Sequence, residues 1–77
     1  MAHIKIINDT NQAQSITVHI NGERQEISSL GPSRTCSFSR DGDMTVVVYR
    51  SWNSVFWHGI VQAGETVVLR FTTAAGN

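Results

Sequence analysis

The sequence has a single cysteine and no excess of charge, and each of these scarcities excludes a class of protein. Cys36 stands alone in the 77-residue chain, so no disulfide can form within it. Six Lys or Arg residues balance six Asp or Glu residues, and the basic ones are spread along the chain. Because nucleic-acid affinity depends largely on a clustered basic field, we expect no nucleic-acid partner.

Long hydrophobic runs are also absent. No segment approaches the roughly 20 apolar residues of a membrane helix, and the N-terminal MAHIKIINDT lacks the apolar stretch of a signal peptide. We therefore expect a soluble protein with no membrane partner, and the lone cysteine favours the cytoplasm. A domain released from a secreted precursor would have the same features, so secretion is the alternative.

Alternation of apolar and polar residues predicts an all-β fold. Ile16, Val18 and Ile20 point to one side of a strand, and the Asn21-Gly22 that follows is a strong signal for a type I′ hairpin. In the last expected strand, Val67, Leu69 and Phe71 lie on one face. No segment has the 3.6-residue period of a helix. The strands are expected at about 3–7, 15–20, 23–30, 35–40, 44–49, 54–62 and 66–72.

About seven short strands of this kind predict a single antiparallel β-sandwich or small barrel, with the spacing of Ig-like and jelly-roll folds. The domain is expected to span residues 1–77, with a short flexible tail at about 73–77. The polar segment 23–30 is expected at a sheet edge, where charges discourage pairing with other chains. We expect a hairpin turn at 41–43.

Two segments, 44–49 and 54–62, are apolar on both faces. An antiparallel sheet with water on its outer side should alternate apolar and polar residues, so the second apolar face needs a cover. A chain this short has a thin core and few residues to spare for that cover. We therefore expect a second subunit or a ligand there.

The sequence gives only weak signals for catalytic or metal-binding residues. Cys36 and Phe38 alternate with polar residues on an expected strand, so both should face inward. This position favours an inert core cysteine. His3, His19 and His58 form no closely spaced ligand pair, and zinc sites usually need three or four ligands. We expect no enzyme activity, no metal and no cofactor. Asn8-Asp9-Thr10 matches a glycosylation sequon, but we expect these residues to shape a loop at 8–14 through hydrogen bonds to the backbone.

The segment RSWNSVFWHG, residues 50–59, concentrates aromatic surface. Phe56 and Trp57 are neighbours on a strand, so they should face opposite sides unless a bulge intervenes, and we expect Trp57 on the outer face. Trp, Tyr and Arg are enriched at interface hot spots because each joins apolar area to a hydrogen-bonding tip. The candidate binding residues are Tyr49, Arg50, Trp52, Asn53, Trp57 and His58.

These observations favour a non-catalytic binding module that self-associates as a homo-oligomer, or docks a protein partner, through this aromatic face. The alternative is a lectin-like carbohydrate-binding protein. In that case Trp52 and Asn53 would form the pocket. The rings of Trp52 and Trp57 would stack on sugar rings, and Arg50, Asn53 and His58 would bind sugar hydroxyls.

Overall fold

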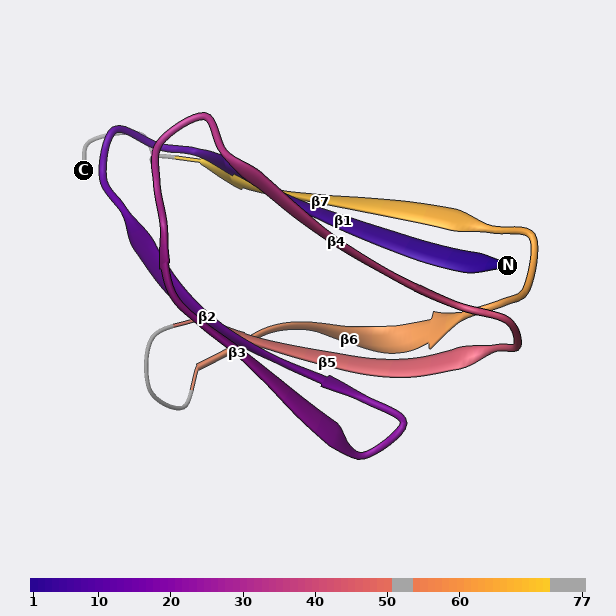
Figure 1. Ribbon diagram of the computed structural model, residues 1–77. Coiled ribbons are helices and arrows are strands. Elements are labelled where there is room, and N and C mark those ends of the chain that lie inside the picture. Colours follow the sequence, from indigo (N-terminus) through magenta and orange to yellow (C-terminus); the bar gives the residue numbers. More distant parts are fainter. Residues whose placement is uncertain (51–53, 73–77) are drawn as a thin grey trace.

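Seven strands form where the sequence alternates between apolar and polar residues (Figure 1). The computed structural model describes residues 1–50 and 54–72. The strands are β1 (Ala2–Asp9), β2 (Gln14–Ile20), β3 (Glu23–Leu30), β4 (Thr35–Arg40), β5 (Met44–Arg50), β6 (Ser54–Val61) and β7 (Thr66–Thr72). The predicted all-β fold is confirmed. None of the described residues forms a helix long and apolar enough to cross a membrane.

The strands make two sheets that pack as the layers of a sandwich, in the orders β4-β1-β7 and β3-β2-β5-β6 (Figure 1). This decides between the predicted sandwich and the small barrel. β3 lies at a sheet edge, as its polar sequence predicts. β1 pairs with β7 in parallel, whereas the other strand pairs are antiparallel. The sequence holds no signal for this exception, because no hairpin joins β1 to β7.

The core lies between the layers and takes one row of side chains from most strands. The inward rows predicted for β2 and β7 are confirmed, and Cys36 and Phe38 of β4 pack against the same core. The buried apolar residues are Ala2, Ile4, Ile6, Ile16, Val18, Ile20, Leu30, Met44, Val46, Val48, Val61, Leu69 and Phe71.

One predicted turn lies within a sheet, and another connects the two sheets. Asn21 and Gly22 both have positive φ, 51° and 84°, as the predicted type I′ hairpin requires. The hairpin predicted at 41–43 is wrong, because this segment carries the chain from β4 in one sheet to β5 in the other. There the Asp43 carboxylate accepts a hydrogen bond of 2.8 Å from the backbone N–H of Ala63, which ties two neighbouring connections together.

Asn8 is the one fully buried polar residue of the described chain. β1 continues through Asn8 to Asp9, so the loop predicted at 8–14 begins later than expected. The Asn8 amide donates to the carbonyl oxygens of Gln12 and Leu30, both at 2.8 Å, and its oxygen accepts from the N–H and hydroxyl of Thr10. The predicted loop-shaping role is confirmed, and the buried amide has no room for a glycan.

Candidate functional site

A β-bulge reshapes the aromatic segment of β6. The Cα partner of Val48 is Trp57, whereas the partner of the next residue, Tyr49, is Val55. Phe56 is therefore an extra residue on β6, and the alternation of side chains resets there. As a result both Phe56 and Trp57 pack against the core, and Val55 turns to the outer face with 52% of its surface exposed.

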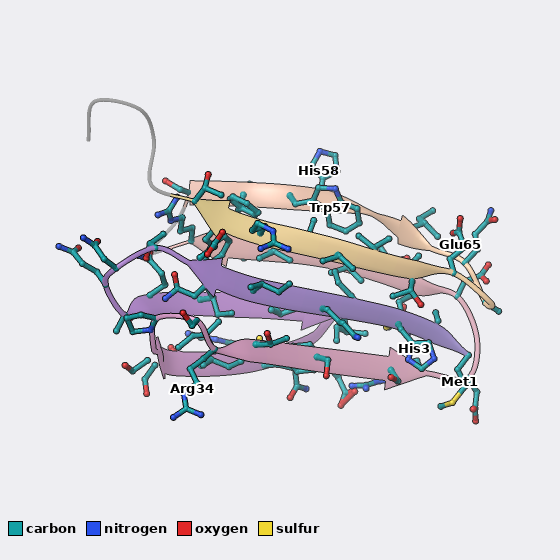
Figure 2. All side chains as sticks on the ribbon, turned by 90° about the horizontal axis from the view of Figure 1, so that it is seen from above. Met1, His3, Arg34, Trp57, His58 and Glu65 are labelled. Carbon is teal, nitrogen blue, oxygen red and sulfur yellow. The ribbon has the colours of Figure 1, made fainter. Side chains whose placement is uncertain are left out.

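Trp57 is partly buried and packs against the core. It is paired with buried Val48, and its indole lies over Gly59, where an added Cβ would be 3.0 Å from ring carbons Cη2 and Cζ2. In Figure 2, His58 projects away from the body of the molecule and Trp57 lies on the other side of the β6 ribbon. The prediction that Trp57 lies on the outer face is wrong, because the bulge supplies the exception to strict alternation.

Arg50 also points inward. Its guanidinium lies 5.0 Å from the centre of the Phe71 ring, and its Nε donates to the side-chain oxygen of Gln14 at 3.3 Å. The Phe56 ring meets Phe71 edge-on, with 4.4 Å between the ring centres. Arg50 thus closes one end of the sandwich over an aromatic pair and is directed away from Tyr49, its neighbour on β5.

The six predicted site residues therefore do not form one cluster. Tyr49 and His58 lie on the outer face of the four-stranded sheet, while Arg50 and Trp57 face its inner side. Trp52 and Asn53 lie outside the described residues.

Strand pairing shows what surrounds Tyr49 and His58. One row across β3, β2, β5 and β6 consists of Arg24, His19, Val47 and His58. The next row consists of Glu26, Thr17, Tyr49 and Val55. Thr45 and Ile60 add a third pair, and Ile60 is 63% exposed. We call this surface the β3-β2-β5-β6 outer face.

The sequence identified only part of this surface. His19 meets Tyr49 edge-on, with 5.3 Å between the ring centres. The outward direction of His19 follows from the alternation in β2 alone. Its position beside Tyr49 depends on the pairing of β2 with β5, and no hairpin signals that pairing because β3 and β4 intervene in the chain.

The outer face of the three-stranded sheet is different in character. It carries mainly hydroxyl and charged side chains, and Val68, 52% exposed, stands opposite Lys5. Arg70 and Asp9 form an exposed ion pair at 3.4 Å. The other members are His3, Ile7, Thr35, Ser37, Ser39, Thr66 and Thr72.

One polar pair on that face has the spacing of a nucleophile and its base. His3 Nδ1 and Ser39 Oγ are 2.6 Å apart on directly opposed strand positions. Nucleophilic catalysis usually needs a third group that orients the base, and within the described ranges His3 has no carboxylate partner. Burial raises the pKa of the Cys36 thiol, which disfavours a reactive thiolate.

Metal coordination has no assembled site in the described part of the chain. No three His, Cys, Asp or Glu side chains come together there, and no buried side-chain nitrogen or oxygen among residues 1–50 and 54–72 lacks a hydrogen-bond partner.

Comparisons with protein-family models, with curated proteins and with solved structures find no match for this chain.

Proposed function

We propose that this chain is a small non-catalytic binding module that self-associates through the β3-β2-β5-β6 outer face. The observation that carries the proposal is the contrast between the two outer faces. One has hydroxyl and charged side chains in most positions, whereas the other gathers Val47, Tyr49, Val55 and Ile60 on adjacent strands. Contiguous apolar surface rimmed by polar residues marks an interaction site.

Charge on this face favours a second copy of the chain as the partner. Its charged residues, Arg24 and Glu26, are bonded to each other at 3.1 Å. The face thus presents no net charge while its histidines are neutral, and the whole chain has a formal net charge of zero. Two copies can approach without the repulsion that usually keeps small domains apart.

The size of the face limits how much surface the association can bury. Four strands spaced about 4.8 Å apart and about 23 Å long offer roughly 400 Å² of flat area per copy. A standard interface buries about 800 Å² per partner. The proposed dimer therefore belongs among weak, transient associations, and it should form in the micromolar range of concentration or above.

A matched pair of substitutions tests this assignment. Val55 on the proposed interface and Val68 on the opposite outer face are the same residue type, and both are 52% exposed. We expect sedimentation velocity over a concentration series to show reversible dimerisation of the wild type and of Val68→Glu, but not of Val55→Glu. A wild type that stays monomeric at millimolar concentration contradicts the proposal, as does an equal loss in both variants.

The carbohydrate-binding alternative has less support. It requires exposed tryptophan rings, and Trp57 packs against the core. The pocket expected at Trp52 and Asn53 lies outside the described residues. The remaining aromatic platform on the described outer face is Tyr49, beside His19 and Thr17. Titration of a glycan panel, followed by intrinsic fluorescence, tests this alternative. A fluorescence change that is lost in Tyr49→Ala would support sugar binding at this face.

A further inference from the structure

Two histidines share one row of the proposed interface. Val47 is the Cα partner of His19 on one side and of His58 on the other. Adjacent strands are about 4.8 Å apart, so the backbones of the two histidines are about 10 Å apart on the same face. His19 is half-buried against the Tyr49 ring, and His58 is exposed.

Few groups on this face can compensate a positive charge. From β3, Arg24 is directly opposite His19, and Glu26 is already bonded to Arg24. From β5, the facing residues are Thr45, Val47 and Tyr49, none of which has a carboxylate, an ammonium or a guanidinium group. From β2 the further member is Thr17, and from β6 the further members are Val55 and Ile60. Glu26 is thus the sole carboxylate among the described residues of these rows.

We propose that protonation of His19 and His58 causes the self-associated chains to dissociate, so that pH controls the oligomeric state. This inference rests on the proposed function, because it concerns the same interface. Histidine is the side chain whose ordinary titration falls between pH 5 and 8. With neutral imidazoles the face carries no net charge, whereas their protonation gives each copy two positive charges with no free carboxylate to receive them.

The direction of the effect follows from solvation and repulsion. Packing two faces together removes the imidazoles from water, which disfavours their charged form. A two-fold dimer also brings four imidazolium groups together, and like charges across an interface oppose association. Self-association is therefore strongest at pH 7.5 or above and is lost as the pH falls towards 5.5. Because the interface is small, little surplus binding energy opposes this loss.

The test measures the dimer dissociation constant by sedimentation equilibrium at pH 7.5 and pH 5.5 and constant ionic strength. The proteins are the wild type, the double variant His19→Gln/His58→Gln and the control His3→Gln, whose histidine lies on the opposite outer face. We expect the dimers of the wild type and of His3→Gln to weaken at least tenfold at pH 5.5. That pH is one unit below the ordinary pKa of an imidazole, about 6.5, so each imidazole that an interface keeps neutral there contributes about a factor of ten. The double variant should change less than about threefold. Near-UV circular dichroism checks that each protein remains folded at both pH values.

The outcomes separate the two proposals. A wild type that dimerises equally at both pH values overturns the pH control and leaves self-association standing. A double variant that dissociates as strongly as the wild type also overturns it, because groups other than these two histidines would then be responsible. A wild type that is monomeric at both pH values, even at millimolar concentration, contradicts the proposed function and the pH control with it.

Discussion

The indole of Trp57 lies against the backbone of Gly59, two positions along the same strand and on the same inner face. Gly59 is paired with buried Val46, so a larger side chain there would point into the core. The missing side chain makes room for the indole, and the bulge at Phe56 directs the indole to that room. Together, Gly59 and the bulge allow Phe56 and Trp57 of this edge strand to pack against the core.

Substitution of Gly59 tests this relationship. An added Cβ would lie 3.0 Å from two atoms of the Trp57 ring, and valine adds two methyl groups beyond it. Because overpacking forces side chains off their preferred positions, we expect Gly59→Val to lower the free energy of unfolding by about 1–3 kcal/mol. Urea denaturation measures this change, and a red shift of native fluorescence would report displacement of the indole.

Gly42 is the matched control for that experiment. No atom lies within 4 Å of its Cβ position, and its φ is not positive. Gly42→Val should change the free energy of unfolding by less than about 0.5 kcal/mol. A loss in Gly59→Val as small as that in Gly42→Val would contradict the prediction, because the indole could then move away from Gly59.

Asn8 should be the most sensitive polar residue of the fold. Asn8→Ala leaves the carbonyl oxygens of Gln12 and Leu30 and the N–H of Thr10 without their side-chain partner. The bond to Leu30 is buried and the other two are partly buried. A buried group left unpaired costs about 1–3 kcal/mol, so we expect a loss of about 2 kcal/mol in the free energy of unfolding. Exposed Asn11→Ala is the control, and a comparable loss there would contradict the assignment.

We expect the Arg50 side chain to stabilise the folded state. Arg50→Ala removes the guanidinium from the Phe71 ring and the hydrogen bond to Gln14, for an expected loss of about 1 kcal/mol. Arg24→Ala, which breaks an exposed ion pair, should cost less than about 0.5 kcal/mol. Thermal unfolding of both variants provides the comparison, and an Arg50→Ala protein as stable as the wild type would remove the structural role.

The thiol of Cys36 should react slowly. Burial raises its pKa above the ordinary value of 9.0, although a backbone hydrogen bond partly opposes the shift. At pH 8 the native thiolate population is therefore smaller than in the unfolded chain, and alkylation by iodoacetamide should be slower in buffer than in urea. The folded state holds this proton more tightly, so stability should also fall as the pH rises above about 9. Cys36→Ala is the control that lacks this loss, and native alkylation as fast as in urea would contradict the prediction.

The sequence determined the local elements because their signals lie within a few residues of one another. Alternation in β2 and β7 fixed which side chains face the core, and Asn21-Gly22 fixed the hairpin that joins β2 to β3. The polar composition of β3 placed it at an edge. These features depend on side-chain periodicity and on backbone dihedral preferences, which are properties of short segments.

Tertiary structure alone decided which strands are neighbours and where alternation fails. The parallel pairing of β1 with β7 and the contact of His19 with Tyr49 join segments that no turn connects. The bulge at Phe56 depends on how β6 fits β5 and the Phe71 ring, and it moved Trp57 from the expected outer face to the core. Such choices follow from packing between distant segments, so the sequence located the aromatic segment, but only the folded sandwich determined which of its side chains reach the surface.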